Sequence, residues 1–247
     1  MIDLHCHILP GVDDGSRSSR VSLAMAAMAE DSGVTDIAAT PHFQYDLQDA
    51  AGAKQRMAEL TETLQARLKA DGLSLRLHVG AEILCIPQTP ELLRRGLLPT
   101  VGGSRYLLVE FMFDTPAEEI DDMLLRLEAE GVRVLLAHPE RYHDVQEQLE
   151  YLVRWFRRGV ILQCNKGSIL GSLGHRSQRT AHWMLDHGLA HVVASDAHTE
   201  RVRTPHMAEV KAFLEESWGE EYADVLLTRN PARILQDRAV VSPDGEW

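Results

Sequence analysis

Positive charge is scarce in this sequence. Its 247 residues include 25 lysines and arginines against 37 aspartates and glutamates, a formal net charge of −12, and only four residues are lysines. Proteins that grip nucleic acid rely on clustered cations to neutralise the phosphate backbone. The composition therefore argues against an extended nucleic-acid interface. A small anionic group could still bind, because divalent cations would concentrate positive charge within one pocket.

Cysteine is equally scarce, and long apolar runs are missing. Cys6, Cys85 and Cys164 are an odd number and lie far apart, without the paired spacing of a zinc or redox motif. No window approaches the roughly 18 apolar residues of a membrane span. The first residues, MIDLHCH, contain no basic stretch followed by an apolar one, as a secretion signal would. We expect a soluble cytoplasmic protein with reduced thiols and no insertion into a membrane.

The rest of the composition is that of an ordinary globular protein. Apolar residues make up 45% of the chain and charged residues 25%, which is enough to bury a sizeable core. A length of 247 residues suits one barrel of alternating strands and helices. We predict a single domain over residues 1–247, in which about 236–247 form a loose tail.

Short β-type runs alternate with segments whose apolar residues are spaced by three and four, as in helices. Alternation of this kind predicts an α/β fold with a parallel sheet. Seven units would close as a distorted, TIM-like (β/α)7 barrel; an open doubly wound sheet has the same local pattern, and we favour the barrel. The predicted strands are Ile2–His5, Val34–Ala39, Ser74–Gly80, Tyr106–Phe111, Val132–Ala137, Val160–Cys164 and His191–Ala194. The predicted helices are Ser18–Ser32, Ala53–Asp71, Ala117–Glu130, Val145–Arg158, Arg176–His187 and Met207–Ser217, with a short one around Glu91–Arg95.

Glycine marks the ends of several predicted helices. A glycine just after the last helical turn can adopt the left-handed conformation that stops a helix. Five helices end in this way and lead at once into a predicted strand, at Gly33, Gly72, Gly131, Gly159 and Gly188. These glycines give five independent boundary markers for the alternating pattern.

Histidines and acids recur at, or just after, the carboxyl ends of the predicted strands. In a barrel these ends meet at one mouth, which is where active sites lie. Residues spread over nearly the whole chain would therefore come together in one place. The residues in question are His5, His7, His42, Glu82, Glu110, His138, Asp196 and His198.

Two pairs within this set favour metal binding. His5 and His7, like Asp196 and His198, are two positions apart, so in extended chain both members point to the same side. Buried carboxylates and imidazoles are costly unless they are paired or bound to metal, and lysines are too few to neutralise them. Mixed nitrogen and oxygen ligands suit manganese, iron or zinc better than calcium. We expect no site role for the other histidines, at positions 78, 143, 175, 182, 187, 191 and 206.

Six segments carry a resemblance to a known family: MIDLHCHILPGVDDG, ATPHF, GAEI, LVEF, AHPERY and ASDAHTERVR. They resemble the polymerase and histidinol phosphatase (PHP) family, and more closely its bacterial capsule-operon tyrosine phosphatases of the CpsB type. The similarity runs in order from Met1 to about Arg203, and the spacing HxHxxxxxxDG together with HPER is typical of that subgroup. The resemblance implies a distorted barrel of seven βα units, in agreement with the strand pattern.

The resemblance also implies a site of three divalent ions, usually Mn²⁺, with Fe or Zn as alternatives. Its ligands would be His5, His7, Glu82 and Asp196 for one ion, the shared Glu82 with Glu110 and His138 for a second, and Asp14, His42 and His198 for the third. The family places a ligand directly before the glycine of the DDG motif, which selects Asp14 rather than Asp13. Arg141 and Arg203 would contact phosphate.

The implied function is that of a metal-dependent protein-tyrosine phosphatase. A hydroxide bridging the ions would attack phosphorus, and the partner would be the phosphotyrosine-containing tail of a bacterial kinase of polysaccharide synthesis or export. Histidinol phosphatase, or another small-molecule phosphoesterase of the family, is the alternative. The resemblance assigns no role to the loop Gln44–Ala51 or to Lys166, and native metal, physiological substrate, general acid and oligomeric state stay open.

Rival hydrolase classes fit the residues less well. A cysteine phosphatase needs an arginine six residues after its nucleophile, whereas Val12, Glu91 and Leu170 follow the three cysteines at that distance. Amidohydrolases also begin with HxH but commonly use a bridging modified lysine after a central strand, and none of the lysines is so placed. A metal-binding module without catalysis is disfavoured because the full set of implied ligands is present.

Overall fold

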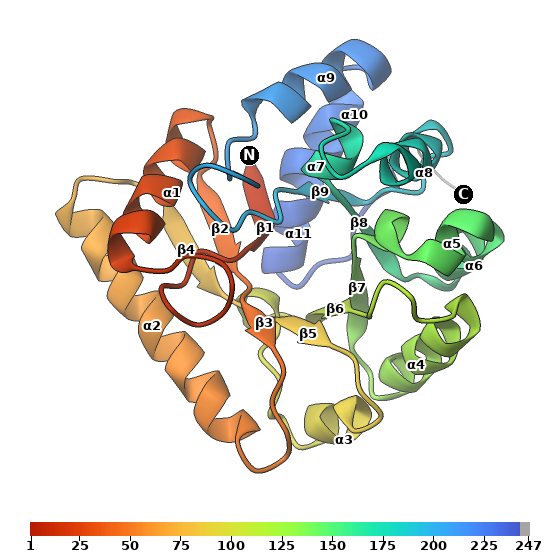
Figure 1. The fold of residues 1–247 in the computed structure, drawn as a ribbon, viewed down its shortest axis with the longest axis horizontal. Coiled ribbons are helices and arrows are strands. Elements are labelled where there is room, and N and C mark those ends of the chain that lie inside the picture. Colours follow the sequence, from red (N-terminus) through yellow and green to blue (C-terminus); the bar gives the residue numbers. More distant parts are fainter. Residues whose placement is uncertain (243–247) are drawn as a thin grey trace.

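The computed structural model describes residues 1–242 and contains parallel strands surrounded by helices (Figure 1). Each predicted strand is present, and two further short strands follow the second and the third. This confirms the predicted α/β class. The strands are β1 Ile2–Cys6, β2 Asp36–Ala39, β3 His42–Phe43, β4 Arg76–Val79, β5 Glu82–Leu84, β6 Tyr106–Glu110, β7 Arg133–Ala137, β8 Ile161–Asn165 and β9 Val192–Ala194.

The strand pairings follow a ring. One sheet has the order β1-β2-β4 and the other the order β3-β5-β6-β7-β8-β9, with every pair parallel. The ends of this series meet, because Cys6 of β1 forms a parallel bridge with Ala197, shortly after β9. Two backbone hydrogen bonds of 2.8 Å support the bridge, from Asp196 N to His5 O and from His7 N to Ala197 O. These pairings agree with a distorted seven-fold ring rather than an open sheet.

The distortion lies in the second and third units, where a further short strand follows the predicted one after a break. Pro41 separates β2 from β3 and has no N–H to donate to a ladder. Gly80 separates β4 from β5 at a close approach, since a Cβ there would lie 3.0 Å from a methyl carbon of Thr40. The split lets the upper halves, β3 and β5, leave one sheet and join the other. His42 and Glu82 come directly after the two breaks.

Helices enclose the ring on its outer side, most of them at the predicted positions (Figure 1). The predicted helix Val145–Arg158 is instead two helices, because Gln148 leaves helical geometry at φ −130° and ψ 68°. The five predicted glycine stops are confirmed, each with φ between 63° and 98°. The helices are α1 Ser19–Asp31, α2 Ala50–Ala70, α3 Thr89–Arg94, α4 Ala117–Ala129, α5 His143–Glu147, α6 Glu150–Arg158, α7 Lys166–Ile169, α8 His175–Asp186, α9 Ala208–Trp218, α10 Glu220–Asp224 and α11 Asn230–Leu235.

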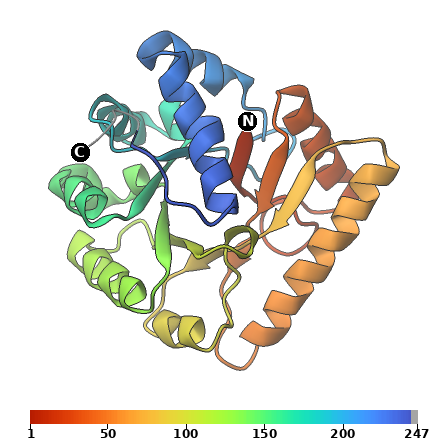
Figure 2. The ribbon, with the colours of Figure 1, turned by 180° about the vertical axis from the view of Figure 1, so that it is seen from behind.

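Apolar side chains fill the lower half of the ring and leave its upper half to polar groups. Leu4, Tyr106, Leu108 and Leu135 belong to one buried cluster inside the ring, together with Ile234 of α11. A second and larger cluster lies between the strands and the surrounding helices. Figure 2 shows α11 and the chain after it crossing the lower end of the ring. The carboxyl ends of the strands therefore form the mouth.

The chain after α11 packs against the ring. The sequence predicts a loose tail from about residue 236. Residues 236–241 instead make specific contacts, and residues 243–247 lie outside the described residues. The Asp237 carboxylate accepts from the backbone and side chain of Arg105, and the Tyr106 hydroxyl donates to the carbonyl of Arg238 at 2.7 Å. Within residues 1–242, none of the helices combines the length and apolarity needed to span a membrane.

Candidate metal centre

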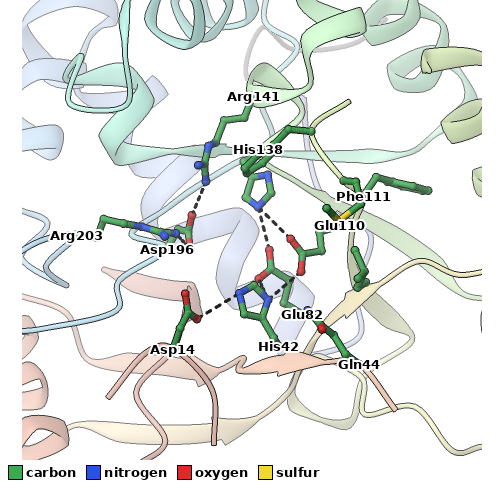
Figure 3. Close-up of a pocket in the computed structure, with 13 residues that line it drawn as sticks. Asp14, His42, Gln44, Glu82, Glu110, Phe111, His138, Arg141, Asp196 and Arg203 are labelled. Atoms are coloured by element: carbon green, nitrogen blue, oxygen red, sulfur yellow. Dashed lines mark hydrogen bonds and ion pairs between the residues drawn. The ribbon is translucent and has the colours of Figure 1, made fainter. Parts of the chain in front are cut away.

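All nine side chains that the sequence predicts as metal ligands meet at the mouth of the ring. Figure 3 shows six of them, namely Asp14, His42, Glu82, Glu110, His138 and Asp196. They come from the ends of β1, β3, β5, β6 and β7 and from the loops after β1 and β9. A bulge in β1 contributes, because the register with β2 shifts between Asp3 and Cys6. Leu4 can thus pack inside the ring while His5, the next residue, also reaches the centre.

Glu82 lies at the middle of the cluster and is almost completely buried. Its carboxylate oxygens lie 3.1 Å from His5 Nε2, 3.3 Å from His7 Nε2, 3.0 Å from His42 Nδ1 and 2.9 Å from His138 Nε2. Burial alone would raise its pKa, but the imidazoles, His5 foremost, hold the pKa of Glu82 well below its usual range. Glu82 is therefore ionised and touches four potential ligands at once.

Asp196 is a second buried carboxylate that several histidines approach. Its Oδ1 atom lies 3.6 Å from His5 Nε2, 3.5 Å from His7 Nε2 and 3.6 Å from His198 Nδ1. His5, His7 and Asp196 offer ligand atoms within 4.8 Å of one another. Glu82 adds its oxygens to the same imidazole nitrogens, so the four residues proposed for the first ion surround one point.

The outer groups share residues differently from the sequence expectation. Asp14 Oδ1 lies 3.5 Å from His42 Nε2 and 3.4 Å from His198 Nε2, so the expected third group is together. His42 also approaches the expected second group, with Nδ1 2.8 Å from Glu110 Oε1. His138 is 4.0 Å from Glu110. His42 thus bridges two of the three expected groups.

The carboxylates of the cluster raise the pKa of the imidazoles beside them. Burial disfavours a charged His5, but Glu82 and Asp196 outweigh burial and raise its pKa to about 9. Burial likewise opposes charge on His42, and Glu110 with Glu82 raises its pKa to about 11. Metal ions bind the deprotonated imidazole, so they would replace these protons. The donor set of imidazole nitrogens and carboxylate oxygens fits divalent manganese, iron or zinc.

Asp13, to which the sequence analysis gives no role, orients His7. Its Oδ2 atom lies 2.7 Å from His7 Nδ1 and accepts from the backbone N–H of His42 at 2.9 Å, while Oδ1 accepts from Gly15 N. A carboxylate on the outer nitrogen of a histidine leaves the inner nitrogen for metal. Gly15 is required here, because a Cβ would lie 2.4 Å from the carbonyl oxygen of His7. The adjacent Asp14 stays largely exposed and faces the mouth.

Gln163 and Asn165 link two of the expected ligands through a buried chain of hydrogen bonds. His5 Nδ1 lies 2.9 Å from Gln163 Oε1, Gln163 Nε2 donates to Asn165 Oδ1 at 2.8 Å, and Asn165 Nδ2 donates to Asp196 Oδ2 at 2.5 Å. An amide oxygen only accepts, so His5 must keep a proton on Nδ1, and a metal ion that displaces its other proton would bind at Nε2. The available sequence signal is a pair of polar residues at alternate positions of a buried strand.

Two arginines approach Asp196 from different loops (Figure 3). Arg141 Nη1 lies 3.3 Å from Asp196 Oδ2, and the guanidinium of Arg203 contacts Asp196 Oδ1. The Arg141 guanidinium carbon also lies 4.4 Å from the centre of the Phe113 ring. Arg141 and Arg203 therefore line the pocket next to the acid cluster. This pocket has a volume of about 240 Å³.

Lys166 stabilises the loop that carries Arg203. Its buried ammonium group donates to the carbonyl oxygens of Thr204 and His206. Burial lowers the pKa of Lys166. Lys166, to which the family resemblance assigns no role, thus links the end of β8 to the loop after β9.

Backbone strain concentrates at the same place. Among residues 1–242, the non-glycine residues with positive φ are His138 at 36°, Asp196 at 49°, Arg203 at 53° and Asp237 at 56°. Such conformations are unfavourable for L-residues and persist where the surroundings enforce them, commonly at functional sites. Three of the four belong to the expected site.

The loop Gln44–Ala51 borders the mouth only at its start. Gln44 lines the same pocket as His42, and Tyr45 lines a neighbouring hollow. The Asp46 carboxylate accepts from the backbone N–H groups of Gln48 and Asp49, which forms a turn. Helix α2 begins at Ala50 and leads away from the site.

The cysteines are poorly suited to nucleophilic attack. Cys6 and Cys164 are fully buried, and burial raises the pKa of both thiols well above the usual value. Burial raises the pKa of Cys85 as well. A thiol needs a lowered pKa to supply thiolate at neutral pH, so none of the three environments favours a cysteine mechanism.

Fold and site together define an α/β barrel protein with imidazole and carboxylate groups gathered at its mouth. Residues 1–236 match the family described as capsular polysaccharide synthesis, CpsB/CapC, and the chain belongs to that family. It is 31% identical to the tyrosine-protein phosphatase YwqE of Bacillus subtilis, over 97% of this chain and 93% of that protein. It is 29% identical to the tyrosine-protein phosphatase CpsB of Streptococcus pneumoniae, over 97% of this chain and 100% of that protein.

Comparison with solved structures supports the same family assignment. The chain superposes with a TM-score of 0.90 and 31% sequence identity on a structure from work on YwqE of Bacillus subtilis and CpsB of Streptococcus pneumoniae. The alignment covers 98% of this chain and 97% of that one, and the work describes these proteins as unique metal-dependent tyrosine phosphatases.

Proposed function

We propose that this protein is a metal-dependent phosphatase that hydrolyses phosphotyrosine in proteins. The observation that carries the proposal is the convergence of two arginines on Asp196, beside a buried cluster of imidazoles and carboxylates. Cations and guanidinium groups on one side of a pocket suit a dianionic phosphate. The names of the relatives support tyrosine as the phosphorylated residue.

The proposed cofactor is Mn²⁺, in three sites. Asp13, Gln163 and Asn165 would hold the ligands in the orientation that leaves their inner atoms free. Bound divalent ions would neutralise phosphate charge and supply a nucleophile from water at neutral pH. The ligands would be His5, His7, Asp14, His42, Glu82, Glu110, His138, Asp196 and His198.

The other groups at the mouth would bind and orient the substrate. Arg141 and Arg203 would each present a fork of N–H donors to the phosphate oxygens, a geometry that matches phosphate. Met112 and Phe113 line the same pocket and provide an apolar wall for the ring of tyrosine. A phenolate leaving group, with a pKa of about 10, needs less protonation than an alkoxide. We assign no general acid.

The proposed partner is the phosphotyrosine-containing tail of a bacterial kinase of polysaccharide synthesis or export, in the cytoplasm. Membership of a family of capsular polysaccharide synthesis supports this assignment. The three cysteines, unpaired in the structure, suit a reducing compartment.

One assay separates the proposal from its alternative. Protein reconstituted with Mn²⁺ is compared on a phosphotyrosine peptide, a phosphoserine peptide and histidinol phosphate, with kcat/KM as the measure. The phosphotyrosine peptide should be preferred by at least about tenfold, or 1.4 kcal/mol. A preference for histidinol phosphate would support the alternative, a small-molecule phosphatase, and reject the protein substrate.

A further inference from the structure

A second hollow adjoins the metal pocket on the side of α8. It has a volume of about 350 Å³ and shares Phe113 and Arg141 with the metal pocket as a common wall. Figure 3 shows Arg141 reaching from its loop toward Asp196, at the edge of the metal pocket. We call this hollow the α8 groove; its remaining lining comes from α5, from Leu173 and from the first residues of α8.

The α8 groove presents two arginines in a strongly acidic protein. The titratable side chains that line it are Arg141, His143, His175 and Arg176, and no carboxylate is among the lining residues described. The whole chain carries a formal net charge of −12. The two arginines beside the mouth therefore favour an anionic ligand at this point.

The hollow on the opposite side of the mouth is lined by acidic side chains instead of arginines. Asp13 and Asp14 line it with His42, Gln44 and Tyr45, and its described lining contains no lysine or arginine. On that side, within residues 1–242, a bound peptide would meet no guanidinium group, whereas the α8 groove offers Arg141 and Arg176. The difference would favour an anionic residue on the α8 side of the phosphorylated one.

Arg176 is available for a ligand despite an existing ion pair. Its Nη1 atom lies 2.9 Å from Glu147 Oε1, but the two side chains are 65% and 63% exposed. An ion pair this exposed contributes little, because water and salt screen it. A substrate anion could therefore replace Glu147 at little cost.

We propose that the α8 groove is a subsite for an anionic side chain of the peptide substrate, next to the phosphotyrosine. This inference rests on the proposed function. Extended chain advances about 3.3 Å per residue, so a side chain one or two positions from the phosphotyrosine would pass the Phe113 wall and enter the groove. A carboxylate and a second phosphate share the required chemistry, and experiment can tell them apart.

The first test compares phosphotyrosine peptides that differ only in the two residues on each side. These residues are alanine, glutamate or lysine, or include a second phosphotyrosine. The glutamate peptide should exceed the alanine peptide by about fivefold in kcat/KM, the effect of about 1 kcal/mol expected from one charge contact, and the lysine peptide should be poorest. A stronger effect from the second phosphotyrosine would identify phosphate as the preferred anion. Equal values for all peptides would overturn the proposal.

The second test reverses the charge of the groove. Arg176→Glu should abolish the preference for glutamate over alanine while turnover of para-nitrophenyl phosphate, which has no flanking residues, stays unchanged. Arg67→Glu is the matched control, because Arg67 is 61% exposed on α2 and does not line the groove. An undiminished preference in Arg176→Glu would reject the subsite. Hydrolysis of phosphotyrosine peptides without any flanking preference would reject the subsite alone, whereas no hydrolysis of any of them would reject the proposed function as well.

Discussion

The guanidinium group of Arg203 contacts the carboxylate of Asp196, and both residues have a positive φ. Two unfavourable backbone conformations are thus maintained within one contact. In the proposed enzyme Asp196 holds a metal ion, so its partner Arg203 is already positioned beside the ion before substrate arrives. Arg141 reaches the other oxygen of Asp196 in the same way.

Replacing either arginine with alanine should lower kcat/KM for a phosphotyrosine peptide by about 10- to 100-fold, since a charge-assisted hydrogen bond is worth roughly 1.5–3 kcal/mol. Lysine should restore activity only in part, because it cannot match two phosphate oxygens at once. Metal content, measured by elemental analysis, should be unchanged. Wild-type kcat/KM in both metal-loaded variants would show that neither arginine binds phosphate.

Chelation should abolish hydrolysis, and Mn²⁺ should restore it better than Mg²⁺. Imidazole-rich sites suit softer divalent ions, whereas magnesium prefers oxygen ligands and retains its water. Activity and bound metal are measured together after dialysis against chelator and after titration with each ion. Full activity in protein shown to be free of metal would contradict the proposed cofactor.

The triple change of Cys6, Cys85 and Cys164 to serine should leave turnover largely intact, because a raised pKa keeps all three thiols protonated at neutral pH. His138→Ala or Asp196→Ala should remove nearly all activity, since each deletes a proposed ligand. Circular dichroism and metal analysis check the fold and the metal content of each variant. A folded but inactive triple serine variant would require a cysteine mechanism.

Gln163→Met should weaken metal binding by about 10- to 100-fold, as is typical when the hydrogen-bond partner of a metal ligand is lost. The change removes the acceptor for His5 and breaks the connection to Asp196. Affinity is measured by competition with a fluorescent chelator. Asn230→Met is the control, because Asn230 is also fully buried but donates to the carbonyl oxygen of His191, outside the cluster. If both variants bind metal equally well, the amide chain does not position the ligands.

His191 should make the fold sensitive to acid. Burial lowers its pKa from 6.5 to about 4, and its Nδ1 atom accepts from the backbone of Leu162. The unfolded chain therefore binds a proton at His191 more readily than the folded chain does. The free energy of unfolding is unaffected by this proton above pH 6.5 and decreases as the pH falls from 6.5 toward 4. The loss is at most about 3 kcal/mol.

A comparison with His191→Gln tests this dependence. Urea unfolding of both proteins is measured between pH 7 and pH 4, in chelator so that metal release does not contribute. The free energy of unfolding should fall less with pH in the variant. Equal falls in the two proteins would show that His191 has the same pKa in the folded and the unfolded chain.

The strands and most helices could be predicted because their signals are local. Gly131 and Gly159, for example, stop helices wherever the rest of the chain lies. The breaks at Pro41 and Gly80 could not be predicted, because they depend on how two neighbouring strands approach each other. The break at Gln148 lacks both glycine and proline, and the helices after Trp218 are too short to show a period.

The meeting of the site residues could also be predicted, since parallel strands share a carboxyl end. The individual hydrogen-bond partners of the site residues could not be predicted. Lys166 acts on Thr204, 38 positions away, and Asn165 acts on Asp196, 31 positions away. The position of His42 between two groups of ligands likewise depends on the displaced strand β3, for which the sequence gives no sign.

The bridge between Cys6 and Ala197 also sets an order on the assembly of this protein during its synthesis. During synthesis the first strand cannot form this bridge until nearly two hundred further residues have been added. Closing the long loop between the two bridge residues is also slow. His5 and His7 cannot meet Asp196 and His198 before that moment. The nascent chain therefore lacks the complete set of donors, so an ion that needs all of them could bind only after the ring has closed.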